Sequence, residues 1–279
     1  MTNSSLLKIS DSSDKLHRRA NSAPWRWLLT LVLLAAALAA RAEVTLDPAT
    51  ASAEGHELAQ KILAQLPAGK VTNTGTLEIR DATRKTSSVS IKCVIGAGGA
   101  DWSQTYLASF PAGTETLTVT RHAPSVDPSA PTNTAPNLIF SDTCVYCPSG
   151  GQPREIPPEA SNAPFAGSDF SVADLRLGFL YWPRQKIIKK EFRRQCPCLV
   201  LESTNPHPAA GGYRRVVSWI DEESLGLVEA HAYDSNNLEL KYFYPKNLEK
   251  VNGQYQLESM VIENVQTRTK STFEFDLHK

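Results

Sequence analysis

The stretch YRRVVSWIDEESLGLVEAHAYDSNNLELKYFYPKNLE, residues 213–249, decides the fold. It contains three runs rich in β-branched and aromatic residues, separated by short polar turns such as Asp234-Ser235-Asn236-Asn237. Such runs are typical of β-strands, and the turns leave no room for a helix between them. Consecutive strands without intervening helices predict an antiparallel meander rather than a parallel α/β sheet.

The same pattern continues on both sides of this stretch. Strand-like runs follow or precede it at residues 71–80, 87–95, 102–110, 114–120, 187–195, 197–203, 255–265 and 271–277. Several of them alternate apolar and polar residues, as half-buried antiparallel strands do. The sequence therefore predicts a mainly β protein with four or five strands before residue 122 and seven after residue 165.

Helices are few in this pattern. Residues 51–66 carry apolar side chains at helical spacing and are followed by Pro67, so they predict one amphipathic helix. Ser171 and Asp174 have the spacing of a capping box, which predicts a short helix to about Leu177. Residues 122–165 are rich in Pro, Ser, Asn and Gly and predict a long loop inserted into the domain.

The N-terminus has the pattern of an export signal. A basic segment precedes the uncharged run LLTLVLLAAALAA, residues 28–40, and Ala40-Arg41-Ala42 fits a cleavage site. Residues 1–42 are therefore predicted to be a cleaved signal peptide, and residues 43–279 a single periplasmic domain. An uncleaved inner-membrane anchor is the alternative, but the run is shorter than the ~20 residues of a membrane span. Cleavage leaves 23 basic and 27 acidic residues, a balance that argues against a nucleic-acid binder.

An ordered set of motifs resembles a known family. GSDFS at residues 167–171, CLVLES at 198–203, VSWID at 217–221 and AYDSNNLELKYF at 232–243 are followed by ESMVIENVQTRTKSTFEF at 258–275. Together they look like the outer-membrane lipoprotein-sorting family, and more narrowly its uncharacterised LolA-like branch. The resemblance covers residues 160–279 well and residues 51–120 loosely. It implies a strongly curved antiparallel sheet of about eleven strands, an open half-barrel, with helices covering the concave face and space for acyl chains.

A carrier of this kind needs an apolar trough, because burying each CH₂ group stabilises the complex by about 0.8 kcal/mol. Branched and aromatic residues at alternate strand positions are the lipid-binding candidates. They are Leu77, Ile79, Val89, Ile91, Trp102, Tyr106, Phe110, Leu117, Val119, Leu240, Tyr242, Tyr244, Phe273 and Phe275. Leu58, Ile62 and Leu66 are predicted to form a lid on the amphipathic helix. The sequence leaves open whether these residues line a cavity or fill a packed core.

A basic stretch between residues 184 and 194 has two interpretations. It comprises Arg184, Lys186, Lys189, Lys190, Arg193 and Arg194. These cations could attract an anionic membrane surface or an acidic envelope protein. The interpretation that the sequence favours is a solvated strand edge whose lysines discourage edge-to-edge pairing.

Four of the five cysteines come in two tight pairs, Cys144 with Cys147 and Cys196 with Cys198. In an exported protein such pairs first predict disulfides, here between the two pairs. A bridge of this kind closes a loop of about fifty residues and typically contributes about 2–4 kcal/mol. The alternative is a zinc ion held by the four thiolates, although the C-P-C spacing is tighter than usual. Cys93 lies at an apolar strand position and is expected to be a buried thiol.

No catalytic motif points to an enzyme, and no cofactor is predicted. The sequence lacks G-x-S-x-G, H-E-x-x-H and a phosphate-binding glycine loop. The leading hypothesis is a periplasmic lipid- or lipoprotein-binding carrier that buries acyl chains reversibly. The alternatives are a structural or interaction module of the cell envelope with a self-filled core, and a zinc-binding envelope protein.

Overall fold

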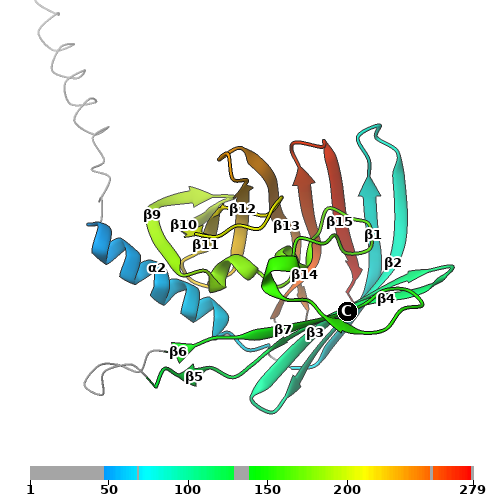
Figure 1. Cartoon of the computed structure of the whole chain (residues 1–279), viewed down its shortest axis with the longest axis horizontal. Helices are drawn as coiled ribbons and strands as arrows, with labels where there is room; N and C mark the ends of the chain where they lie inside the picture. The colour runs from blue at the N-terminus through cyan, green and yellow to red at the C-terminus, as the bar shows by residue number, and fades with distance from the viewer. Residues whose placement is uncertain (1–46, 68, 129–137, 252–253, 278–279) are drawn as a thin grey trace, which may run out of the picture. The chain divides into compact units, whose positions relative to one another are not determined.

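The computed structural model describes residues 47–67, 69–128, 138–251 and 254–277 (Figure 1). The predicted signal peptide, residues 1–42, lies outside the described residues. No helix in the described part of the chain has the length and apolarity to cross a membrane.

The described residues form fifteen strands and four helical elements. The strands are β1 Val71–Arg80, β2 Thr86–Gly98, β3 Asp101–Phe110, β4 Gly113–Arg121, β5 Ser125–Val126, β6 Leu138–Ile139, β7 Asp142–Cys147, β8 Arg154–Glu155, β9 Arg184–Arg193, β10 Cys196–Thr204, β11 Arg215–Asp221, β12 Leu227–Tyr233, β13 Glu239–Val251, β14 Gln254–Asn264 and β15 Thr269–Asp276. The helical elements are α2 Pro48–Leu63, η1 Pro158–Ala160, α3 Val172–Leu175 and η2 Gly178–Tyr181.

Thirteen of these strands form one antiparallel sheet in the order β8-β7-β4-β3-β2-β1-β15-β14-β13-β12-β11-β10-β9. β1 pairs with β15, so the first and last strands of the domain meet in the middle of the sheet. The sheet curves but does not close, because β8 and β9 are its outer strands (Figure 1). The predicted fold class, a mainly β protein with one strongly curved open sheet, is confirmed.

The segment predicted as a long loop, residues 122–165, is more ordered than expected. It contains β5 to β8 and η1, and β7 and β8 extend the sheet beyond β4. The C-V-Y-C motif lies in β7, where Cys144 is paired with Val119 and Tyr146 with Leu117. The loop prediction failed because Pro and Gly residues surround this strand and conceal the alternation of its six residues. These two strands raise the count above the eleven or so expected.

The two sheet faces differ in what covers them. The concave face, defined here as the face that carries α2, α3 and η2, holds the main hydrophobic core, which includes residues of all three elements. The outer face carries a second cluster of Cys198, Val200, Val217, Trp219 and Val228, called here the outer cluster. Alternation along the strands sends neighbouring side chains to these two clusters.

Helix α2 begins three residues earlier than predicted and also ends three residues earlier. Asp47 caps it by accepting hydrogen bonds from the backbone N–H groups of Ala49 and Thr50, at 3.0 and 3.3 Å, and Pro48 occupies the first turn. The helix stops at Leu63, consistent with Pro67, which disfavours helical backbone at the preceding residue. Leu66 is therefore past the helix end and 71% exposed, so its predicted place in the lid is wrong.

The same helix lies against β9 at very close range. A Cβ atom added to Gly55 would lie 2.5 Å from the backbone nitrogen of Lys186 and 2.7 Å from the carbonyl carbon of Gln185. These neighbours are backbone atoms of a strand and cannot move aside independently. Gly55 therefore sets the distance between α2 and the sheet.

We predict that Gly55→Ala destabilises the protein by about 1–3 kcal/mol, because the new methyl group overpacks the helix–strand contact. In an exposed helix the same change would instead stabilise by about 1 kcal/mol. Urea unfolding measures the difference, and Glu54→Ala, one residue away at a site that is not buried, serves as the control. A Gly55→Ala protein as stable as the unsubstituted one would contradict the close contact.

Candidate functional site

The concave face brings together most of the predicted apolar residues. Leu77, Ile91, Tyr106 and Phe273 are at most 5% exposed and belong to the main core. Leu117 and Val119 are also buried there. The remaining residues of this face are partly buried at the margin of the same core; they are Ile79, Val89, Phe110, Leu240 and Phe275.

Two predicted residues, Tyr242 and Tyr244, lie on the other side of the sheet. They stack on each other with ring centroids 6.0 Å apart, and Tyr242 also stacks on His231 of the outer face. The cause is a β-bulge in β13, where the register shifts at Leu240 between Lys241 and Glu239. One extra residue exchanges the two faces of a strand, so Phe243 enters the core in place of the tyrosines.

Trp102 is a further exception to the predicted set. It is partly buried and lies outside the main core, and its ring stacks under the Arg121 guanidinium, 5.0 Å from the ring centroid.

The lid residues Leu58 and Ile62 do face the core, with exposures of 4% and 8%. Helix α2 therefore covers the concave face, with Leu63 in the position that Leu66 was expected to take.

The centre of the concave face is covered by residues 156–182, called here the cover segment. Two of its phenylalanines, Phe165 and Phe170, are completely buried. Phe170 lies 4.5 Å from the ring of Phe273, and Phe165 lies 6.1 Å from the ring of Tyr106. The predicted lipid-binding face is thus occupied by the protein's own aromatic side chains.

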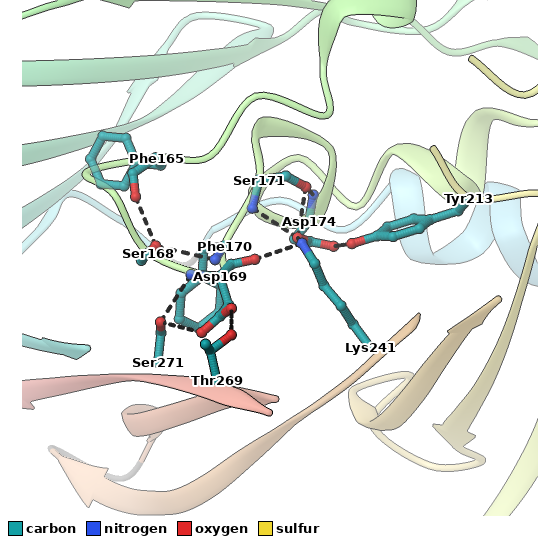
Figure 2. Close-up of polar contacts among 10 residues, drawn as sticks. All are labelled: Phe165, Ser168, Asp169, Phe170, Ser171, Asp174, Tyr213, Lys241, Thr269 and Ser271. Atoms are coloured by element: carbon teal, nitrogen blue, oxygen red, sulfur yellow. Dashed lines mark hydrogen bonds and ion pairs between the residues drawn. The ribbon is translucent and has the colours of Figure 1, made fainter. Parts of the chain in front are cut away.

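Asp169 fastens the cover segment to β15 (Figure 2). Its carboxylate accepts hydrogen bonds from the hydroxyl groups of Thr269 and Ser271, the latter at 2.8 Å. The backbone N–H of Asp169 donates to the same Ser271 hydroxyl, at 2.9 Å. These bonds place the GSDFS motif directly against the strand.

Lys241 of β13 makes a second attachment (Figure 2). Its ammonium donates to the carbonyl oxygen of Asp169 at 2.6 Å and to the Asp174 carboxylate at 3.3 Å. Asp174 also accepts a 2.7 Å bond from the Tyr213 hydroxyl and completes the predicted capping box with Ser171. The Lys241 and Asp174 side chains are only 12% and 2% exposed, so this ion pair is buried.

These polar anchors were missed by the sequence analysis, which assigned Asp174 to a capping box alone. The sequence carries no clear signal for Lys241, because strict alternation groups it with Glu239, and the bulge at Leu240 that breaks this alternation is seen only in the structure.

A third attachment joins the cover segment to the far end of the sheet. Arg176 forms a two-pronged ion pair with Asp142 of β7, and its guanidinium lies 5.6 Å from the ring centroid of Tyr181. The two charged side chains are 8% and 1% exposed. The cover segment therefore spans the concave face between β7, β13 and β15.

Beside the cover segment lies a cavity of about 370 Å³. Its walls come from η1, α3, η2 and the loop that joins β10 to β11. None of the predicted lipid-binding residues lines this cavity, although Phe179 and Tyr213 of the main core do.

The basic stretch lies mainly on β9, and most of its charges are paired. Lys189 and Lys190 form ion pairs with Glu191 and Glu222, and Arg193 and Arg194 both bind Glu229. Arg184 and Lys186 are exposed and have no carboxylate partner among the described residues. The stretch is thus chiefly a set of strand-edge ion pairs.

Glu229 is the centre of an ionic cluster on the outer face. Its carboxylate binds Arg193, Arg194 and the Nε2 atom of His231, while the His231 Nδ1 atom lies 2.8 Å from Glu239. Burial acts to raise the pKa of Glu229, but the hydrogen bonds from Arg193, His231 and Arg194 outweigh it and lower the pKa from 4.5 to about 2.

The predicted pairing of the cysteines is not found, since all five are free. Cys144 is buried in the main core of the concave face, whereas Cys198 belongs to the outer cluster. Nine strands separate β7 from β10 in the sheet. The zinc alternative fails for the same reason, because these four thiols cannot reach one ion. Cys93 is buried on an apolar strand face, as expected.

We predict that Glu229 makes the free energy of unfolding depend on pH. A carboxyl group whose pKa is lowered on folding stabilises the protein fully above its unfolded pKa, near 4.5, and loses this effect as the pH falls towards 2. The stability difference between the unsubstituted protein and Glu229→Gln should therefore shrink between pH 4.5 and pH 2. Denaturant titrations at several pH values measure it, and parallel curves for the two proteins would exclude this role.

We also predict the order in which the thiols react. Burial raises the pKa of Cys93, Cys144 and Cys198 to about 11 each, so their reactive thiolate form is scarce. Cys147 and Cys196 are partly exposed and should react first with iodoacetamide in the folded protein. After unfolding without a reductant, all five should be alkylated. Finding a Cys144–Cys198 bridge by mass spectrometry would contradict the structure.

Comparisons with known proteins agree with this fold. A DUF1329 family protein from Desulfovibrio piger superposes with a TM-score of 0.61 at 18% identity, over 81% of this chain and 91% of that one. An outer membrane lipoprotein-sorting protein domain from Vibrio parahaemolyticus gives 0.60 at 18% identity, with the same coverage. The LolA superfamily protein NE2245 from Nitrosomonas europaea gives 0.51 at 13% identity, over 81% and 92%.

No curated protein matches the chain. Residues 139–278, half of the chain, match the model of a family described as an uncharacterized protein. The resemblance found in the sequence is confirmed: the chain belongs to this uncharacterized family, and its fold is that of the LolA-like proteins of outer-membrane lipoprotein sorting.

Proposed function

We propose that the protein is a lipid- or lipoprotein-binding carrier of the periplasm that buries acyl chains on the concave face of its sheet. The observation that carries this proposal is the way the apolar face is closed. A sheet of thirteen strands is covered by α2 and a segment of short helices and turns, instead of a second sheet. The names of the structural neighbours support the same class of cargo.

An acyl chain would take the place of the cover segment's own aromatic side chains. Phe165 and Phe170 fill the centre of the face, so the closed structure leaves the cargo no room there. Each CH₂ group that enters contributes about 0.8 kcal/mol, and a long chain can therefore offset the loss of these two rings and their anchors. The backbone is in the left-handed region at Ala166 and Gly167, before Phe170, and at Leu177, after the capping box, and we expect the segment to hinge at these positions.

The polar anchors decide how easily the cover segment leaves. Lys241, Asp174 and Tyr213 hold it by a few directed bonds, and none of these bonds is part of the sheet. In a protein that must open before it binds, the apparent affinity equals the intrinsic affinity multiplied by the fraction of open molecules. Weakening an anchor should then strengthen binding.

We predict that Lys241→Gln binds a fluorescent fatty acid such as cis-parinaric acid more tightly than the unsubstituted protein, by about tenfold if the anchor contributes about 1.4 kcal/mol. Val217→Ala is the matched control, because it destabilises the outer cluster without touching the cover segment. Fluorescence titration gives both affinities. Equal or weaker binding by Lys241→Gln, with Val217→Ala unchanged, would refute the opening mechanism.

A second function is favoured by the packing itself. The completely buried rings of Phe165, Phe170 and Phe273 make a self-filled core, which suits a structural or interaction module of the envelope. Native mass spectrometry of protein purified from its own periplasm separates the two functions. Bound lipid masses support the carrier, and a protein that carries no lipid and binds no fatty acid supports the module.

A further inference from the structure

The cavity is lined by both aromatic and amide side chains. Phe179, Tyr181 and Trp182 of the η2 region line it, and so do Asn162 and Asn205. With a volume of about 370 Å³, the cavity is at the small end of ligand sites in proteins. It is therefore sized for a compact ligand and not for a long chain.

Several polar groups on these walls have no partner within the described part of the chain. The amide of Asn162, the hydroxyl of Tyr181 and the indole N–H of Trp182 make no hydrogen bond to the described residues. All three side chains are partly buried. Burial raises the pKa of Tyr181 to about 12, which keeps its hydroxyl protonated and able to donate. The walls thus offer both donors and acceptors to a ligand.

The charges around the cavity argue against an ionic ligand. Among the described lining residues, Arg176 already forms a buried ion pair with Asp142. Glu159 and His207 also line the cavity, and both are exposed to water. A charged ligand would therefore lose its hydration without gaining an unpaired, buried opposite charge.

We propose that this cavity binds the ring of a neutral sugar. Such a ring has apolar C–H faces that pack on aromatic side chains, and hydroxyl groups at its edge that pair with amide and phenol groups. The ring could belong to a free oligosaccharide or to the headgroup of a glycolipid. The inference does not rest on the proposed carrier function, but most of the lining residues belong to the cover segment, so the cavity is intact only while that segment is closed.

The test uses the purified full-length protein, with maltose, lactose and N,N′-diacetylchitobiose as neutral probes and glucuronic acid as the charged one. Saturation-transfer NMR and titration should show binding of at least one neutral disaccharide and no binding of glucuronic acid. Trp182→Leu should weaken that binding by about tenfold, as expected for loss of one wall contact and one hydrogen bond. Phe192→Leu, an exposed aromatic on β9, should leave it unchanged.

Asn162→Leu is a second variant, in which leucine has nearly the same shape as the asparagine that it replaces. The test therefore does not depend on how well Trp182→Leu folds. Dodecyl maltoside below its micelle concentration distinguishes the two sources of the sugar. If maltose binds as well as dodecyl maltoside, a free oligosaccharide is the ligand. If dodecyl maltoside binds far better and both variants still weaken it, a glycolipid headgroup is the ligand. The proposal is wrong if no neutral disaccharide or maltoside binds, or if neither variant weakens binding.

Discussion

The burial of one apolar sheet face is the constraint on which the rest of the structure depends. An open sheet of thirteen strands exposes a wide concave surface, and water contact with Leu77, Ile91, Tyr106 and Phe273 would be costly. The protein covers this surface with α2 and the cover segment rather than with more strands. Whatever binds to the concave face must compete with that cover.

Apolar contact alone would not fix the position of a cover made of turns and short helices. The buried ion pairs Lys241–Asp174 and Arg176–Asp142 fix the position of the cover segment on the sheet, because each charge is stabilised only where its partner lies. Such pairs add little net stability compared with apolar replacements, yet they define one register for the cover on the sheet. The proposed carrier function requires that a segment held in this way separate from the sheet as a unit, whereas a purely structural domain has no such requirement.

Much of the fold followed from alternation along the strands. The mainly β class, the single curved sheet, the capping box at Ser171 and the inward side of α2 were all predicted correctly. The failures have local physical causes. Strand β7 was concealed by surrounding Pro and Gly residues, and a bulge at Leu240 moved Tyr242 and Tyr244 to the outer face. The cysteines were misjudged because their pairing depends on sheet order and sheet face, which spacing along the chain does not reveal.

The central claim is that the cover segment opens while the sheet stays folded. Amide hydrogen exchange, read residue by residue, tests this most directly. The account predicts that the backbone N–H groups of Ala166 and Asp169, which donate to the sheet side chains of Glu115 and Ser271, exchange much faster than those at the centres of β1 and β15. It also predicts that a bound fatty acid changes exchange in the cover segment first. Cover and sheet amides that exchange together, only through global unfolding, would contradict the account.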